Sequence, residues 1–365
     1  MIKRVIYFTN VGEKVKEEIE KHYVTDLILS SDGRKEDAKC FISDGFKYHN
    51  PIIFIGALGI AVRMMKDLSQ DKLTDSAFIV MDERKKFVIP VLSGHMGGAI
   101  ELSYDLANKL GSEVVITTAT DVEEKFSVDT FARINHLKIK NKEMIKKVSA
   151  KVLDGKEIRI AIPAGFKIIG EPWDKVIIQY YNNINDLIDL TERNDKNDDN
   201  TICNVDVLIT PGSDLNESFL DKVLILNPKN YIFGMGVRKG KTFEEINEFL
   251  ISNGIDSQWM EDNILYLSSI DLKLKEEGLL NLASFYHTEL VTFNAEELAA
   301  LKGDFKESEF VKETVGVSNV CERAAALLAY RLDDSYDNKL FKEKTAGNGI
   351  TFAVVKIDRR QFSWR

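Results

Sequence analysis

The stretch Tyr231-Ile-Phe-Gly-Met-Gly-Val-Arg-Lys-Gly240-Lys-Thr242-Phe-Glu-Glu245 decides how the second half of the chain folds. It begins with an apolar run typical of a buried strand, turns at glycines, and places Thr242 three residues before Glu245. Thr followed by Glu at this spacing forms a capping box, which satisfies free backbone N–H groups at the start of a helix. The sequence therefore predicts a strand that leads directly into a helix.

The same alternation of short β-branched runs and amphipathic segments extends outward along the chain. Residues 5–8, 52–55 and 87–92 are predicted strands, and helices are predicted at 13–22, 58–68 and 98–110. This pattern indicates an α/β fold with layered sheets and flanking helices. We expect two principal α/β domains, 1–135 and 230–365, joined by a smaller α/β middle domain, 136–229. Within the middle domain, the Asn- and Asp-rich run 182–200 cannot bury much surface and is predicted to be a mobile insertion.

Composition excludes several classes of protein. The 365 residues carry a formal net charge of −9 and a pI of about 5.3, which argues against a protein that coats nucleic acid. The longest apolar stretch, 52–62, is shorter than the roughly 18 residues of a membrane span. Cys40, Cys203 and Cys321 lie far apart, so we expect reduced thiols rather than disulfides or a zinc site. We expect a cytoplasmic protein with no nucleic-acid or membrane partner, and a homodimer is left open.

Four places at the ends of predicted strands, where open α/β sheets bind ligands, combine glycines with polar residues. The first is Gly56-Ala-Leu-Gly59-Ile-Ala-Val-Arg63. Its glycines could let backbone N–H groups approach an anion at a helix start, or could simply permit tight strand–helix packing. It is not a nucleotide-binding P-loop, because no Gly-Lys-Ser or Gly-Lys-Thr follows.

The second place, Leu92-Ser93-Gly94-His95-Met96-Gly97-Gly98, is the most informative local sequence. His95 stands between a strand and a helix with glycines on both sides, so a buried structural role is disfavoured. An unperturbed imidazole, with a pKa near 6.5, can accept a proton from water at neutral pH. We therefore expect His95 to be functional.

The third place is Ile116-Thr117-Thr118-Ala119-Thr120-Asp121, a strand that ends in small polar residues. Its hydroxyl groups could hydrogen-bond a carboxylate or the backbone. Asp121 could orient a base or cap the next segment, and taken alone it is better explained as a cap.

The fourth place gathers several motifs of the last domain: Gly234-x-Gly236-x-Arg238, Lys273 with Glu276, and Ser318 before a helix. The Arg238 guanidinium can bind a carboxylate at two points, and a helix start can hold another. Each motif alone is common. Together they indicate a site for a ligand with several carboxylates.

Taken in order, these motifs resemble the cobalt-precorrin-5A hydrolases of anaerobic cobalamin biosynthesis. The resemblance rests on the motifs quoted above, on Ser318-Asn-Val-Cys-Glu322 and on Ile350-Thr-Phe-Ala-Val-Val355, and covers nearly the whole chain. The glycine motif of the last domain usually carries a Cys and two Arg in this family, whereas this chain has Val237, Arg238 and Lys239. The missing thiol argues against a universal cysteine nucleophile.

The resemblance implies a hydrolase that opens the δ-lactone of a ring-contracted cobalt corrinoid, cobalt-precorrin-5A. The meso carbon then leaves with its methyl group as acetaldehyde, and the product is cobalt-precorrin-5B. Cobalt arrives with the substrate, so no cofactor and no protein metal site are expected.

This chemistry needs a base and donors for an oxyanion. We assign the base to His95, with Glu276 in reserve, and the donors to backbone N–H groups around Gly97 and Gly98. Arg238, Lys273 and the helix start at Ser318 are predicted to hold acetates and propionates in an interdomain cleft. The main alternative is a non-catalytic tetrapyrrole-binding or carrier protein of the same pathway. A phosphate-binding α/β enzyme ranks last.

Overall fold

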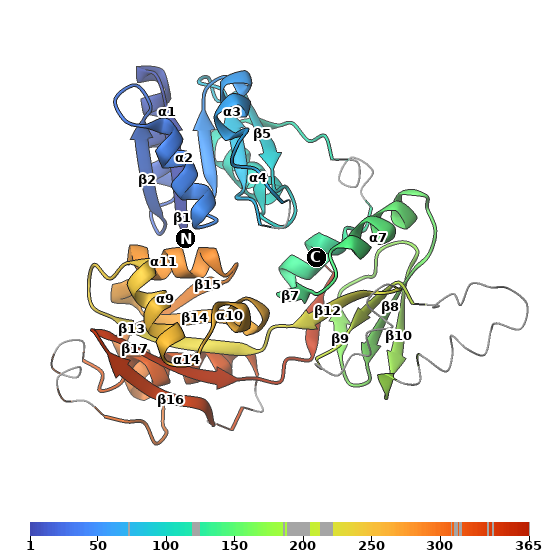
Figure 1. Cartoon of the computed structure of the whole chain (residues 1–365), viewed down its shortest axis with the longest axis vertical. Coiled ribbons are helices and arrows are strands. Elements are labelled where there is room, and N and C mark those ends of the chain that lie inside the picture. The colour runs from blue at the N-terminus through green and yellow to red at the C-terminus, as the bar shows by residue number, and fades with distance from the viewer. Residues whose placement is uncertain are drawn as a thin grey trace, which may run out of the picture. The chain divides into compact units, whose positions relative to one another are not determined.

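The computed structural model describes residues 1–71, 74–118, 125–184, 187, 205–211, 222–307, 309, 313, 316–333, 336–337 and 339–364. The chain forms two compact units (Figure 1). Unit 1 contains Met1–Ile116 and Asn230–Asp358, and unit 2 contains Thr117–Lys229 and Arg359–Arg365. Helices pack against the three larger sheets, so the predicted α/β class is confirmed.

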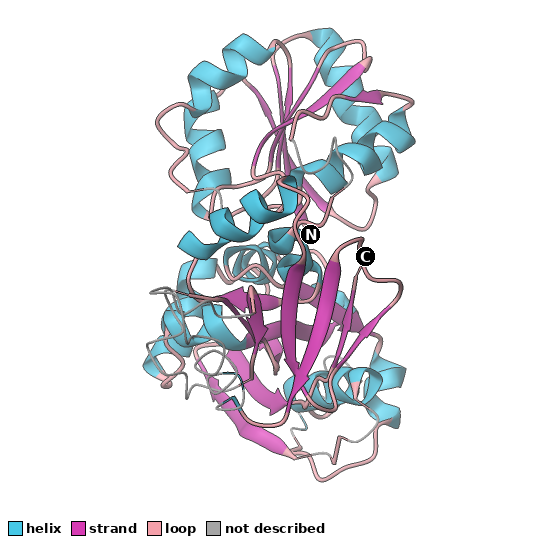
Figure 2. Ribbon diagram, turned by 90° about the vertical axis from the view of Figure 1, so that its right-hand side faces the viewer, coloured by secondary structure: helices cyan, strands magenta, loops and turns pink. Residues whose placement is uncertain are grey.

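The N-terminal sheet of unit 1 has six strands in the order β2-β1-β3-β4-β5-β6. The strands are β1 (Ile2–Tyr7), β2 (Leu27–Asp32), β3 (Ile52–Ile55), β4 (Phe78–Met81), β5 (Phe87–Leu92) and β6 (Glu113–Val114). Buried side chains of α1 (Asn10–His22) and α4 (Ala99–Leu110) pack on one face of the sheet. Those of α2 (Ala38–Lys47) and α3 (Leu58–Met65) pack on the other (Figure 2). Neighbouring strands are parallel except β4 and β5, which form an antiparallel pair.

The C-terminal sheet of unit 1 has the order β15-β14-β13-β17-β16. Its strands are β13 (Tyr231–Val237), β14 (Ile264–Ile270), β15 (Glu289–Phe293), β16 (Leu340–Gly347) and β17 (Ile350–Lys356). The helices are α9 (Phe243–Ser252), α10 (Ser257–Asn263), α11 (Glu277–Phe285), α12 (Ala295–Ala300), α14 (Val320–Leu332) and the 3-10 turn η2 (Asp271–Lys273). One face packs against α9, α10 and α11, and the other against α12 and α14.

The predicted capping box is present at the start of α9. The Thr242 hydroxyl accepts a hydrogen bond from the Glu245 N–H at 3.2 Å, and the Glu245 carboxylate accepts one from the Thr242 N–H at 3.0 Å. Alternating residues of β13 fill both layers, because Phe233 and Met235 face α9 to α11 while Ile232 faces α14. The strand-to-helix prediction from this stretch is confirmed.

Unit 2 contains a five-stranded sheet in the order β10-β8-β11-β12-β7 and a two-stranded sheet of β9 and β18. The strands are β7 (Leu137–Ile139), β8 (Ile158–Pro163), β9 (Lys167–Ile169), β10 (Val176–Tyr181), β11 (Val207–Ile209), β12 (Leu224–Pro228) and β18 (Gln361–Ser363). Its helices are α6 (Val128–Ile134) and α7 (Glu143–Leu153). Apart from 182–184 and 187, the run predicted to be a mobile insertion lies outside the described residues, as does Cys203.

The division into units differs from the predicted domain boundaries in two places. The middle unit begins at Thr117 rather than 136, because α6 packs with β7. The chain end, which the prediction places in the last domain, is grouped with unit 2, where the Ser363 N–H donates to the Asn135 side chain at 2.7 Å; the domain boundaries stay a prediction. None of the described helices is long and apolar enough to cross a membrane.

Candidate functional site

A pocket of about 320 Å³ lies at one edge of the C-terminal sheet. It is lined by the carboxyl ends of β13 and β14, the start of α14 and the β16–β17 turn. Three cationic residues, Arg238, Lys273 and Lys344, are part of its lining, which is otherwise mostly apolar, and no carboxylate residue is part of it among the described residues. We call it the cationic pocket.

The strand directions explain why these residues meet. Because β13 and β14 are parallel neighbours, Arg238 and Lys273 follow strand ends at the same edge. The hairpin of β16 and β17 turns at this edge, since Ile350 pairs with Val237. Sequence reasoning missed Lys344, although Asn348-Gly349 between two strands is the strongest short-range signal for a hairpin. Both of these turn residues have positive φ, 51° and 75°.

Two of the three cations have no carboxylate partner in the described part of the chain. Arg238 is exposed and Lys344 is half-buried, and neither forms an ion pair there. The Arg238 N–H donates to the Gly349 carbonyl at 2.8 Å. A Cβ on residue 349 would lie 2.7 Å from the Arg238 Cδ, so glycine there makes room for the arginine stem. Free cations beside the start of a thirteen-residue helix favour a bound anion.

Glu276, the reserve base, is engaged in the structure. One oxygen accepts the Gly240 N–H at 2.6 Å and the other lies 3.0 Å from the Lys273 ammonium. Its side chain is only 10% exposed. This geometry favours Glu276 as a residue that positions Lys273, and its role as a base stays an untested prediction.

The remaining predicted residues of this domain divide by location. Gly236 lines the pocket, whereas Gly234 is buried beneath α14, where a Cβ would lie 1.7 Å from the Cys321 carbonyl oxygen. Close packing of β13 on α14 therefore accounts for Gly234. Ser318 is buried, and the helix cap is Asn319, whose side chain accepts the Glu322 N–H at 3.0 Å.

Cys321 also lines the cationic pocket, and sequence reasoning assigned it no chemistry. Burial raises the pKa of its thiol to about 11. The thiol is therefore protonated at neutral pH and is a poor nucleophile.

The N-terminal motifs lie at two opposite edges of their sheet. Gly56 follows the carboxyl end of β3, and Gly59 and Arg63 lie on α3, where the exposed Arg63 guanidinium donates to the Gly59 carbonyl at 3.3 Å. The second motif follows β5, which runs antiparallel to β4 and ends beside Phe78, the first residue of β4. The structure does not bring Gly56 and Ser93 together at one edge.

The segment Ser93–Gly98 forms a compact loop, which we call the His95 loop. Its Ser93 carbonyl accepts the Ala99 N–H, and its Gly94 carbonyl accepts the Ile100 N–H, both at 3.2 Å. The His95 carbonyl accepts the Gly98 N–H, also at 3.2 Å, so Gly98 is engaged within the loop and its role as an oxyanion donor stays a prediction. The nearby Gly97 N–H stays the proposed donor. The His95 residue is half-buried.

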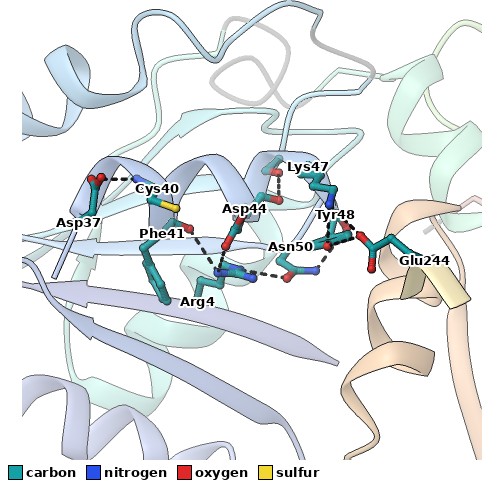
Figure 3. A network of polar contacts seen from close by, with 11 residues as sticks. Arg4, Asp37, Cys40, Phe41, Asp44, Lys47, Tyr48, Asn50 and Glu244 are labelled. Carbon is teal, nitrogen blue, oxygen red and sulfur yellow. Dashed lines mark hydrogen bonds and ion pairs between the residues drawn. The ribbon is translucent and has the colours of Figure 1, made fainter. Parts of the chain in front are cut away.

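The His95 loop lies at the same end of the N-terminal sheet as the residues that contact the C-terminal part of unit 1. Paired residues run across the sheet from Leu92 through Phe78 and Ile52 to Arg4. Figure 3 shows the neighbouring contacts of the Arg4 region, which include Lys47 and Tyr48 bound to one Glu244 oxygen of α9. These two distances are 2.8 and 2.7 Å.

The third motif lies elsewhere. Thr117 and Thr118 are exposed at the start of unit 2, and Asp121 lies outside the described residues. Within the described residues, no group of three or more His, Cys, Asp or Glu side chains could hold a metal ion.

Comparisons with known proteins agree on one family. Residues 41–121 match the family described as Cobalamin synthesis G N-terminal, and residues 231–355 match Cobalamin synthesis G C-terminus. The cobalt-precorrin-5A hydrolase of Salmonella typhimurium is 34% identical over 85% of this chain and 82% of its own length. That of Priestia megaterium is 31% identical over 86% of this chain and 80% of its own.

A solved structure of a cobalamin biosynthesis protein G homolog from Sulfolobus solfataricus covers 98% of this chain and 97% of its own, at 20% identity and a TM-score of 0.40. The family assignment rests on the sequence relatives, which span most of both chains, and on the two matched regions in the expected order. The chain belongs to the cobalt-precorrin-5A hydrolase family.

Proposed function

We propose that this protein opens the δ-lactone of cobalt-precorrin-5A and releases the meso carbon as acetaldehyde, giving cobalt-precorrin-5B. Relatives named for this hydrolase support the proposal at about 30% identity. The structural observation that supports it is the cationic pocket, where Arg238, Lys273 and Lys344 meet and where no carboxylate is part of the lining that the structure describes. A corrinoid with acetate and propionate side chains supplies the anions that such a pocket favours.

The proposed reaction has two bond-breaking steps. Water adds to the lactone carbonyl and the ring C–O bond breaks, which leaves a carboxylate and a free hydroxyl group. Loss of the hydroxyl proton then lets the C–C bond to the macrocycle break. The bonding electron pair stays with the macrocycle, which takes up a proton, and the two-carbon unit leaves as acetaldehyde.

In this proposal His95 is the general base. Its ring takes a proton from the attacking water, from the later hydroxyl group, or from both. A general base contributes about a hundredfold to ten-thousandfold in rate. The Gly97 N–H stabilises the oxyanion that forms on the lactone carbonyl.

The cations serve recognition rather than bond breaking. Arg238 offers a planar fork for one carboxylate, and Lys273 is held in place by Glu276 beside the start of α14. Loss of a charge-assisted hydrogen bond in such a pocket weakens binding by about 1.5–3 kcal/mol.

One assay separates the hydrolase from the carrier alternative. The purified full-length protein is incubated with the lactone-containing cobalt corrinoid, and acetaldehyde is trapped and counted against corrinoid consumed. The hydrolase releases about one acetaldehyde per corrinoid over many turnovers, because the reaction expels a single two-carbon unit. Tight corrinoid binding without acetaldehyde would instead support the carrier.

A further inference from the structure

Glu322 is a buried carboxylate behind the cationic pocket that the proposed mechanism does not use. It lies in the first turn of α14 and is 1% exposed. One oxygen accepts the Lys344 N–H at 2.7 Å. The other accepts the Lys306 N–H at 3.0 Å and the Asn319 side-chain amide at 2.6 Å. The carboxylate therefore ties two separate segments, at Lys306 and Lys344, to the capped start of its own helix.

A carboxylate at this depth is unfavourable unless donors surround it. The donors to Glu322 include two backbone N–H groups from different segments, and the Asn319 amide adds a third. An amide side chain could not reproduce this arrangement, because its NH₂ group cannot accept a hydrogen bond from a backbone N–H. Position 322 therefore favours a carboxylate side chain over an amide.

The backbone beside Lys344 is irregular. Lys342 pairs with Val354 and Thr345 pairs with Phe352, so β16 has one more residue than β17 between these pairs. Such a β-bulge disrupts the ladder locally and can re-aim a side chain. At this bulge the Lys344 N–H donates to Glu322, and the Lys344 side chain lines the cationic pocket.

We propose that Glu322 is a positioning residue that holds the β16 bulge so that Lys344 binds a carboxylate of the ligand. Lys344 is thereby a third binding cation beside Arg238 and Lys273. The identity of that ligand as a corrinoid acetate or propionate rests on the proposed function. The β16 bulge and the buried Glu322 carboxylate are observations that do not depend on the proposed function.

The test measures binding separately from turnover. Dicyanocobyrinic acid, a cobalt corrinoid with free carboxylates, is titrated into the full-length protein and followed by its absorbance. Lys344→Ala is expected to raise Kd about tenfold to a hundredfold, the effect of one lost charge-assisted contact. Lys344→Arg, which keeps the positive charge, should recover part of this loss.

Glu322→Gln should raise Kd by a factor comparable with that of Lys344→Ala, because it misplaces the same ammonium group. In the Lys344→Ala background it should add little, since neighbouring residues that act through one contact are not additive. In the acetaldehyde assay, both variants should raise KM and leave kcat unchanged. Glu297→Gln is the matched control, because Glu297 accepts the Asn294 N–H in the cap of α12 and lies outside the pocket lining.

Three results would overturn the inference: unchanged Kd in Lys344→Ala, fully additive Kd effects in the double variant, or an equal rise for Glu297→Gln. If Glu322→Gln does not fold, Glu322→Asp tests the positioning role instead, because it keeps the charge but is one carbon shorter. That variant must then raise Kd, without adding to Lys344→Ala. A protein that releases no acetaldehyde but shows these Kd changes contradicts the proposed function alone. Normal turnover with unchanged Kd in Lys344→Ala contradicts this inference alone.

Discussion

Glycine-containing turns follow strands in both sheets of unit 1, yet they converge only in the C-terminal sheet. There β13 and β14 are parallel neighbours, so Arg238 and Lys273 share one edge and one pocket. In the N-terminal sheet β5 runs antiparallel to β4, and the His95 loop therefore lies opposite the edge where Gly56 follows β3. Strand direction decides which motifs can act together.

The comparison also separates two kinds of chemistry. The His95 loop carries a titratable ring among glycines, while the cationic pocket carries positive charges and no lining carboxylate in the described chain. We expect the first to govern rate and the second to govern affinity. Variants of the two regions can test whether the His95 loop affects the rate and the cationic pocket the affinity.

The largest effect is expected for His95→Ala. Removing the proposed base should lower acetaldehyde release about a hundredfold to ten-thousandfold. The Kd of dicyanocobyrinic acid should stay close to that of the unmodified protein, because the cationic pocket is unchanged. Both quantities are measured on the same preparation.

His22→Ala is the control for this substitution. His22 is an exposed histidine in the last turn of α1, and its loss should leave turnover unaltered. Near-normal acetaldehyde release by His95→Ala would show that His95 is not the general base. A large rise in Kd would show that the His95 loop contributes to corrinoid binding rather than to the reaction.

A smaller effect is expected for Arg238→Ala. Loss of its contact with a substrate carboxylate should raise KM about tenfold to a hundredfold with little change in kcat, because the contact exists in both ground and transition states. Arg63→Ala gives the counterpart in the N-terminal sheet, where the guanidinium donates to a carbonyl of its own helix. A larger rise in KM for Arg63→Ala would reverse the assignment of binding to the C-terminal sheet.

A methyl group added at Gly234 of β13 or at Gly59 of α3 should change the free energy of unfolding of the protein in opposite directions. Gly234→Ala places the new carbon 1.7 Å from the Cys321 carbonyl oxygen, so α14 must shift, at a cost of about 1–3 kcal/mol or more. Gly59→Ala meets only the Arg63 guanidinium at 3.8 Å and should stabilise α3 by about 0.4–1 kcal/mol. Urea unfolding of each variant gives the free energies.

This pair tests the alternative that sequence reasoning left open for the first motif. Loss of corrinoid binding in Gly59→Ala, with stability retained, would indicate that a ligand approaches the start of α3. Equal destabilisation by the two substitutions would contradict the packing difference.

Local patterns in the sequence predicted individual helices and strands but not the tertiary contacts between them. The Thr242 capping box and the strand before it were predictable, because each depends on residues a few positions apart. Strand β4 and its antiparallel partnership with β5 were not, and they decide where the His95 loop lies. The return of 359–365 to unit 2 depends on contacts with residues more than two hundred positions away, such as Asn135, and has no local signal.

The candidate site shows the same limit. Arg238 and Lys273 could be predicted because each follows a strand end beside a glycine or a carboxylate. The hairpin that carries Lys344 could be predicted from Asn348-Gly349, but the place of Lys344 in the pocket could not, because it depends on a bulge and on the buried Glu322. Family resemblance supplied the activity, but not these contacts.

The smallest effect is expected where the two parts of unit 1 touch, at His49. Its ring lies 4.5 Å from the His287 ring and nearly parallel to it, and its Nδ1 donates to the Phe285 carbonyl at 3.1 Å. Burial lowers the pKa of His49 below 6.5, and the Phe285 carbonyl, Glu261 and Asp75 only partly oppose this shift. The folded protein thus binds this proton more weakly than the unfolded chain does.

Stability from His49 should therefore be fully present above about pH 6.5 and should fall as the pH drops below that value. His49→Asn removes the ring and suits the positive φ of 55° at this position. Urea unfolding above and below this pH should show a smaller acid-induced loss for the variant. His136, whose pKa burial lowers to about 3, contributes equally to both proteins and cancels in the comparison. Equal losses in the two proteins would mean that the contact between the two parts of unit 1 is insensitive to this proton.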